Sequence, residues 1–281
     1  MHRRKSDSRD PVPEPTAQAT LVRAFYRTLA SAWSPQHWWP ADSPIEVIVG
    51  AYLTQNSAWT NVERALANLR AAHLLSVNGI RETPLPRLEI LIRPSGYFRQ
   101  KARRLKTFVE YLDACHHGSL DHMFAQPTEI LRNELLELNG VGPETADSIL
   151  LYAGNHPVFV VDTYTRRILD RHGILPLTSP YEDIRRLFER ALDGGAAGRQ
   201  IHATGLRKNS KAAAAELSGA AHKPSFMSTS RRPALVQTFN EMHALIVGAG
   251  KNYCAKKEPK CGSCPLRRFL PAAPVRSEKI R

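Results

Sequence analysis

Apolar residues recur at helical spacing along most of the chain. Within residues 44–73 they fall at 47, 48 and 51 and again at 62, 65, 66 and 69, which is the spacing of one helix face. We interpret this segment as two helices joined near residues 55–59. The same kind of pattern predicts further helices at 20–33, 87–93, 98–117, 127–139, 143–154, 162–173, 181–192 and 234–254.

Only residues 157–161, PVFVV, read as an extended segment. A β-protein would show a series of alternating strands separated by hairpin turns, and the chain has no such series. The sequence therefore predicts an all-α fold.

Two segments lack the helical pattern. Residues 1–19 are polar and rich in proline, so we expect a disordered tail. Residues 194–233 are small, polar and basic with Glu216 as their single acid, and we interpret them as a flexible insertion. The run KAAAAEL within it is too short to form a stable helix without packing.

Length and charge narrow the class of protein. A chain of 281 residues allows one large domain or two small lobes. Lys and Arg number 39 against 26 Asp and Glu, a formal charge of +13, which favours a polyanionic partner such as nucleic acid, although a merely soluble basic protein has the same balance. The chain has neither an apolar run of about 20 residues nor a signal-peptide pattern, so we expect a cytoplasmic protein with no membrane contact.

The stretch LNGVGPETADSILLYAG, residues 138–154, predicts two helices joined by a tight turn. Gly140 and Gly142 permit a turn whose backbone approaches a ligand, and Pro143 suits a first helical turn. Unpaired amides at the start of the second helix form a site for a phosphate, so we expect this turn to hold a DNA backbone. The alternative is an ordinary corner between two helices.

Asp162 follows the short apolar run and precedes a predicted helix. As an N-cap it would stabilise that helix by about 1 kcal/mol. The functional alternative is an ionised carboxylate beside a cleft, which stabilises positive charge on a sugar or activates water.

The hairpin LNGVGPETA, the aspartate in VVDTYTRRI and a C-x6-C-x2-C motif follow one another in an order that resembles the endonuclease III branch of the helix-hairpin-helix DNA glycosylases. Residues 44–62 also resemble that family's early helix pair, and the likeness covers about residues 22–193 and 235–270. It implies two all-α lobes with DNA and a flipped, damaged base in the cleft between them. One lobe would combine residues 20–43 and 156–275, and the other would span 44–155 and end in the hairpin.

Glu144 departs from part of this family. Bifunctional members carry a lysine at this place, which attacks the sugar, whereas a carboxylate cannot form the Schiff base that strand cleavage needs. We therefore expect a monofunctional glycosylase in which Asp162 stabilises the oxocarbenium-like sugar and helps water attack. Otherwise Glu144 is only a favourable acid in a first helical turn, worth about 0.3–1 kcal/mol.

The resemblance also implies DNA-backbone and base contacts. The backbone contacts fall on Gly140, Val141, Gly142 and Thr145, and Gln55 stands where the family inserts a residue into the gap left by the flipped base; a solvated loop glutamine is the alternative.

HWWPADSP with LTQNSAW resembles a sub-branch that includes 3-methyladenine glycosylases, so we expect Trp38 and Trp39 to stack on a base, with a cationic alkylated purine as a good partner. Tryptophans here also suit a plain core position.

The cysteine motif is incomplete. Cys254, Cys261 and Cys264 fit the family's C-x6-C-x2-C-x5-C pattern, but Leu270 stands at the fourth position and Cys115 lies in another region. Three alternatives follow: a [4Fe–4S] cluster with three of its four protein ligands, zinc held by the three cysteines and a nearby histidine, or thiols that are merely structural.

These observations favour a monomeric, nucleoid-associated DNA glycosylase of base-excision repair that acts on double-stranded DNA with a damaged base. Three alternatives remain at this stage. They are a bifunctional glycosylase and abasic-site lyase, a non-catalytic DNA-binding protein, and a cluster-based redox or sensory protein.

Overall fold

The computed structural model describes residues 16–33, 35–193 and 222–272, and this part of the chain is helical without a strand. The predicted all-α class is thus confirmed. None of the described helices is long and apolar enough to cross a membrane. The α-helices are α1 Ala17–Trp33, α2 Pro44–Thr54, α3 Trp59–Ala71, α4 Val77–Glu82, α5 Leu85–Ile92, α6 Phe98–His116, α7 Leu120–Phe124, α8 Thr128–Glu137, α9 Pro143–Ser148, α10 Thr163–Arg171, α11 Tyr181–Leu192, α13 Phe226–Thr229 and α14 Ala234–Asn252, with short turns η1 Arg93–Ser95, η2 Ile149–Ala153, η3 Cys261–Ser263 and η4 Arg267–Phe269.

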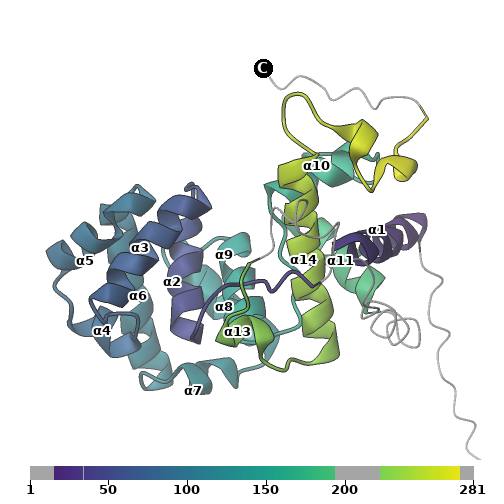
Figure 1. Ribbon diagram of the computed structural model, residues 1–281. Coiled ribbons are helices and arrows are strands. Elements are labelled where there is room, and N and C mark those ends of the chain that lie inside the picture. The colour runs from purple at the N-terminus through teal and green to yellow at the C-terminus, as the bar shows by residue number, and fades with distance from the viewer. Residues whose placement is uncertain (1–15, 34, 194–221, 273–281) are drawn as a thin grey trace, which may run out of the picture.

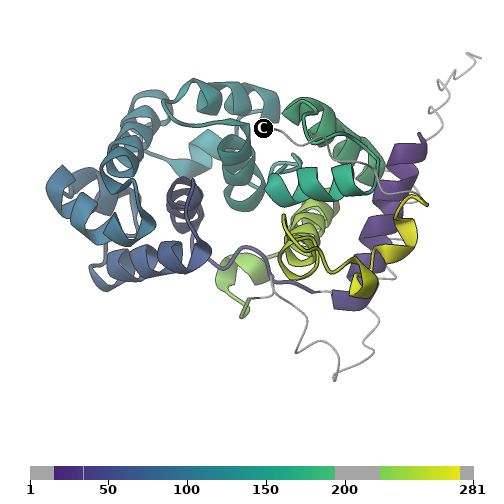
Figure 2. The same ribbon diagram turned by 90° about the horizontal axis from the view of Figure 1, so that it is seen from above.

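The helices form two groups, which lie side by side in Figure 1. In the first group α2 packs against α3 and α6, and α5 packs against α3 and α6. In the second group α1 packs against α11 and α14, and α10 packs against α14 (Figure 2). The π-helical turn η2 contacts both α2 and α14, so it joins the two groups.

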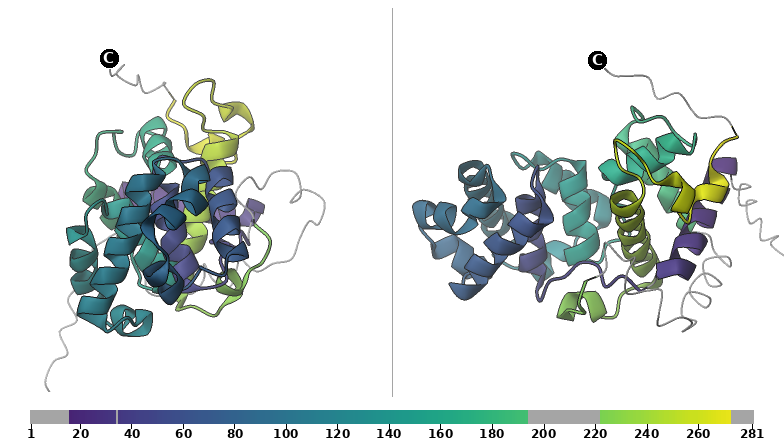
Figure 3. Two further views of the ribbon diagram at one scale, coloured as in Figure 1. Left: turned by 90° about the vertical axis from the view of Figure 1, so that its left-hand side faces the viewer. Right: turned by 45° about the horizontal axis from the view of Figure 1, so that its top comes forward.

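α14 is the central helix of the second group, as the turned views in Figure 3 show. Every residue from Thr238 to Gly250 is buried, because α1, α10, α11 and η2 all pack around it. The C-terminal segment with the cysteine motif lies at one end of α14, beside α10 (Figure 1).

A buried ion-pair network fixes the hairpin helix α9 against its neighbours. Asp147 of α9 is fully buried and accepts two hydrogen bonds from Arg132 of α8, at 2.6 and 3.2 Å. Arg132 also donates to Glu182 of α11 at 2.7 Å. The position of the hairpin therefore depends on charges from three helices.

Residues 157–161, which read as an extended segment in the sequence, belong to neither a helix nor a strand in the described part of the chain. Residues 222–233 are held in place by hydrogen bonds, unlike the predicted flexible insertion: a Ser225 capping box starts α13, and the Met227 amide donates to the Ala41 carbonyl at 3.0 Å. These anchoring contacts could not be predicted from apolar spacing, because they are mostly hydrogen bonds made by a segment with few apolar residues. Residues 17–19 of the predicted disordered tail belong instead to the first turn of α1. Residues 1–15 of the tail and residues 194–221 lie outside the described residues.

The sequence also predicts one helix over 143–154, whereas the chain forms α9 and then the π-helical η2. The short helices α4, α7 and α13 were not predicted, because each is too short for its apolar residues to repeat at helical spacing.

Candidate active site between the two helix groups

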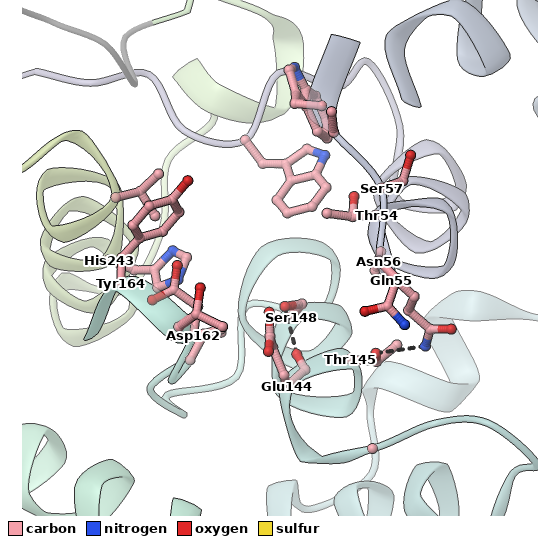
Figure 4. Close-up of a pocket in the computed structure, with 18 of the residues that line it drawn as sticks. Thr54, Gln55, Asn56, Ser57, Glu144, Thr145, Ser148, Asp162, Tyr164 and His243 are labelled. Atoms are coloured by element: carbon pink, nitrogen blue, oxygen red, sulfur yellow. Dashed lines mark hydrogen bonds and ion pairs between the residues drawn. The ribbon is translucent and has the colours of Figure 1, made fainter. Parts of the chain in front are cut away.

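A cavity of about 800 Å³ opens between the two helix groups (Figure 4). Its walls come from the segment before α2, from the α2–α3 loop, and from α6, α9, α10 and α14. It brings together most of the residues that the sequence singled out. These are Trp38, Trp39, Gln55, Gly142, Glu144, Thr145 and Asp162.

Asp162 is the N-cap of α10 and also part of the cavity wall. Its Oδ1 atom accepts hydrogen bonds from the Thr165 amide at 2.7 Å and the Thr165 hydroxyl at 2.8 Å. Its Oδ2 atom lies 3.8 Å from Nε2 of His243. One carboxylate oxygen therefore anchors the side chain, and the other accepts no hydrogen bond from the described residues.

His243 stands behind Asp162 on α14. Burial lowers the pKa of His243, and the nearby Asp162 charge only partly opposes this, so the ring is held neutral. Its Nδ1 atom is 2.6 Å from the hydroxyl of the buried Tyr152, while Nε2 has no hydrogen-bond partner among the described residues. The ring thus presents an unpaired nitrogen towards Asp162.

Glu144 lies in the first turn of α9 and lines the same cavity, as Figure 4 shows. Its carboxyl group forms no hydrogen bond or ion pair with another described side chain. The surrounding protein raises the pKa of Glu144 to about 7, chiefly by desolvation and further by the Asp162 charge, against the opposing effect of Arg166. The side chain is still open to the cavity solvent, because a concave wall surrounds it without covering it.

Gly140 and Gly142 play different parts in the hairpin turn. Gly140 has a φ of +79°, and a Cβ there would lie 1.9 Å from Nε of Arg104, so this position requires glycine. Gly142 is the N-cap of α9 with ordinary backbone, and the space beside it is open. The turn therefore needs the backbone freedom of glycine only at Gly140. The missing side chain at Gly142 leaves room for a ligand.

Val141 also differs from the expected exposed donor. Its side chain is buried, and its amide donates to the Leu138 carbonyl at 3.0 Å within the turn. The Val141 amide is therefore hydrogen-bonded within the turn and is not free to donate to a phosphate.

Gln55 is held firmly against the hairpin. Its Nε2 atom donates to the Gly140 carbonyl and to the Thr145 hydroxyl, both at 2.9 Å, and its Oε1 atom accepts from Arg104 at 2.7 Å. It is therefore not a solvated loop glutamine, and insertion into a duplex would first break three hydrogen bonds. In this structure Gln55 ties the end of α2 to the hairpin turn.

Three tryptophans form the aromatic wall of the cavity. Trp39 contacts Trp59 and Tyr152, each with ring centroids 5.2 Å apart, and Trp38 contacts His243 at 5.9 Å. Trp38 and Trp39 are almost fully buried, whereas Trp59, which the sequence analysis did not single out, is more exposed. The indole nitrogens of Trp39 and Trp59 have no partner among the described residues.

The contribution of α14 to the cavity was not predicted from the sequence. His243 and Lys251 both line the cavity although they lie eight residues apart, because two helical turns return the chain to the same face. Partial burial lowers the pKa of Lys251, with the Asp162 charge opposing it. The spacing of His243 and Lys251 along one face of a predicted helix is the signal that could have revealed them.

The cysteine motif lies apart from the cavity. Cys254, Cys261 and Cys264 surround a pocket with room for about one water molecule, which Arg171 and His172 also line. Arg171 donates to the Cys254 sulfur at 2.8 Å, and burial raises the pKa of the Cys254 and Cys264 thiols.

The donor set does not fit a four-thiolate cluster. Leu270 lines this pocket where the fourth ligand would stand, and its side chain has no ligand atom. No group of three or more His, Cys, Asp and Glu side chains in the described part of the chain is arranged to hold a metal ion. His172 Nδ1 is buried without a partner among these residues, but it does not complete such a group.

An all-α fold of two helix groups, with a glycine hairpin turn and a buried aspartate facing the cleft between them, defines the helix-hairpin-helix glycosylase fold. The sequence profile of the HhH-GPD superfamily of base excision DNA repair proteins matches residues 49–193, and the chain belongs to this family. The family resemblance inferred from the hairpin and Asp162 is thus confirmed.

Individual relatives agree with this assignment. A protein of Methanocaldococcus jannaschii named as a DNA repair glycosylase is 36% identical over 251 residues, which are 89% of this chain and 95% of that protein. Endonuclease III of Thermotoga maritima is 29% identical over 161 residues, 56% of this chain and 71% of that one.

Among solved structures, the 3-methyladenine DNA glycosylase of H. pylori, bound to 1,N6-ethenoadenine, is similar with a TM-score of 0.63 and 25% identity, covering 84% of this chain and 98% of that one. A trapped endonuclease III–DNA covalent intermediate is similar in fold, with a TM-score of 0.64 and 19% identity, covering 90% of this chain and 95% of that one.

Proposed function

We propose that this protein is a monofunctional DNA glycosylase that hydrolyses the N-glycosidic bond of a damaged base in double-stranded DNA. The observation that carries the proposal is the position of Asp162, whose side chain lines the cleft beside the hairpin while its Oδ1 atom is anchored by Thr165. A fixed carboxylate in a site with little water stabilises the positive charge that develops on the sugar. The same carboxylate is placed to orient the attacking water.

The hairpin turn and the aromatic wall supply the remaining parts of this function. Gly142 and Thr145 line the cleft, so a DNA backbone can approach the start of α9, where Gly142 provides no side-chain cap. Trp38, Trp39 and Trp59 provide aromatic surface for a flipped base, and we propose an alkylated purine as one substrate class. The likeness to a 3-methyladenine glycosylase supports this choice.

We expect base release without strand cleavage. A panel of duplexes with single damaged bases should yield free base, and strands should break only after alkali, because Glu144 cannot form a Schiff base. Borohydride should trap no covalent DNA adduct.

Two lysine amines line the cavity, and either of them could in principle form a Schiff base in place of the missing lysine at position 144. The Lys101 amine donates to the carbonyls of Leu53 and Ser95, both at 2.7 Å, which leaves Lys251 as the more available nucleophile. Nicking at the rate of base release, with an adduct that Lys251→Gln abolishes, would contradict the monofunctional assignment. No base release from any duplex would contradict the enzyme assignment itself.

DNA affinity should fall steeply with salt, with a slope of about −0.9 in log K against log[salt] for each phosphate neutralised. Gly140→Val should weaken binding to damaged and undamaged duplexes alike by about tenfold, because a left-handed backbone costs a branched residue about 1–2 kcal/mol and phosphate contacts carry no base information. Fluorescence anisotropy at several salt concentrations measures both effects.

Gly262→Ala is the matched control, since the space beside Gly262 is open and the residue lies away from the cavity. Its affinity should equal that of the wild type. A loss confined to damaged DNA in Gly140→Val would argue against a phosphate-binding hairpin.

A further inference from the structure

The cleft contains two carboxyl groups in unlike surroundings. The Asp162 side chain is anchored by Thr165, whose amide and hydroxyl both donate hydrogen bonds to the Oδ1 atom. Glu144 has no hydrogen-bond donor among the described residues and lines the same cavity. Two carboxyl groups whose environments differ in this way are suited to two different roles in one reaction.

We propose that Glu144 is a general acid that protonates the leaving base, and that the chain therefore releases neutral damaged bases as well as cationic ones. This inference rests on the proposed glycosylase function and deepens it by naming a substrate class. A cationic alkylated purine leaves as a neutral molecule and needs no acid. A neutral base would leave as an anion unless a proton reaches one of its ring nitrogens while the bond breaks.

The proposed step balances as a hydrolysis. The C1′–N bond breaks, its electron pair goes to the base nitrogen, and the Glu144 proton is transferred to a ring nitrogen of the base. Water then adds its oxygen to C1′ and releases one proton, which restores the protonated carboxyl group. Asp162 stabilises the positive sugar in between. The products are the free base and an abasic site, with no other reactant consumed.

Position and charge both support this role for Glu144. The residue follows directly after the hairpin turn that we propose to hold the DNA backbone, so its carboxyl group stands beside a bound nucleotide. Desolvation and the Asp162 charge raise its pKa to about 7, and a base that fills the cavity would displace water and desolvate the group further.

The other titratable groups near Glu144 do not supply this proton as readily. Burial lowers the pKa of His243 and holds the ring neutral, and burial raises the pKa of Tyr152 and Tyr181 well above the ordinary value. The cation whose charge acts on Glu144 is Arg166 on α10. Lys251 on α14 and Lys101 and Arg104 on α6 line the same cavity. Arg166 opposes the protonated form of Glu144, so removing Arg166 should extend acid catalysis to higher pH.

The test compares a neutral and a cationic lesion under single-turnover conditions with enzyme in excess. Duplexes with 1,N6-ethenoadenine and with 7-methylguanine serve as the two probes. For the wild type, release of ethenoadenine should fall about tenfold per pH unit above pH 7, because deprotonation of Glu144 removes the acid, while release of 7-methylguanine should not show this fall. Glu144→Gln should slow ethenoadenine release by at least about 10²-fold and remove the descending limb. It should change 7-methylguanine release by less than about threefold.

Glu137→Gln is the control, since it removes one negative charge from an exposed position on the preceding helix α8, outside the cavity. It should match the wild type on both probes, and equal thermal midpoints should show that both variants fold. If Glu144→Gln retains ethenoadenine release, or loses release of both bases alike, Glu144 is not the acid. If the wild type releases 7-methylguanine only, the inference is wrong and the glycosylase function stands. If it releases no base from any duplex of the wider panel, the proposed function itself is wrong.

Discussion

Asp162→Asn is expected to reduce single-turnover base release by at least about 10²-fold, the loss typical when one electrostatic stabiliser of a transition state is removed. Asparagine keeps the size and the Oδ1 acceptor for the Thr165 amide but removes the negative charge. Because asparagine and aspartate cap helices about equally well, the thermal midpoint should hardly change. The two measurements together separate the chemical role of Asp162 from its structural one.

A second capping residue provides the control. Ser76 caps α4 by accepting a hydrogen bond from the Gly79 amide at 2.9 Å, and it lies outside the cavity. Ser76→Ala should cost about 1 kcal/mol of stability and leave base release unchanged. If Asp162→Asn released a good substrate base at the wild-type rate with unchanged stability, the residue would be an N-cap and no more.

Asp147→Asn is expected to lower the free energy of unfolding by roughly 3–5 kcal/mol, because it leaves the Arg132 charge buried without its main counter-ion. Chemical denaturation followed by circular dichroism measures this loss. The effect reaches function as well, since Asp147 lies in α9, whose first turn carries Glu144. We expect base release to fall in the same variant through displacement of that helix.

An exposed ion pair on α4 and α6 is the matched control. Arg81 and Asp113 are bound 2.5 Å apart with both side chains a third or more exposed, and Asp113→Asn should cost no more than about 1 kcal/mol. The double variant Arg132→Met with Asp147→Leu should recover much of the lost stability, since apolar pairs often replace buried ion pairs at little cost. Equal losses for Asp147→Asn and Asp113→Asn would show that burial does not decide the strength of this pair.

Features with local causes could be predicted from the sequence. The spacing of apolar residues predicted most of the helices, from α1 through α14, because a helix face repeats within four residues. Asp162 was recognised as a capping position from the helix that follows it. The positive φ of Gly140 is a local property of the turn, so the hairpin could also be predicted from the sequence. Family resemblance then supplied the expectation that these parts meet at one cleft.

Features that depend on contacts between distant residues could not be predicted in this way. Gln55 reads as a loop residue, yet three hydrogen bonds to α6 and the hairpin fix it. Residues 222–233 read as flexible, but they are held by bonds to the segment before α2. Nothing in the sequence distinguishes His243 and Lys251 from the other polar residues of α14, and only the structure shows that they face the cavity.

By itself the sequence determined the all-α class, the hairpin turn, the capping aspartate and the absence of a lysine at position 144, because each follows from side-chain chemistry or from interactions within a few residues. Only the tertiary structure decided which groups share the cavity, that Glu144 stands free beside an anchored Asp162, and that Trp59 and α14 complete the walls. The physical reason is that desolvation and charge coupling depend on everything packed around a group, and packing brings together residues far apart in the chain.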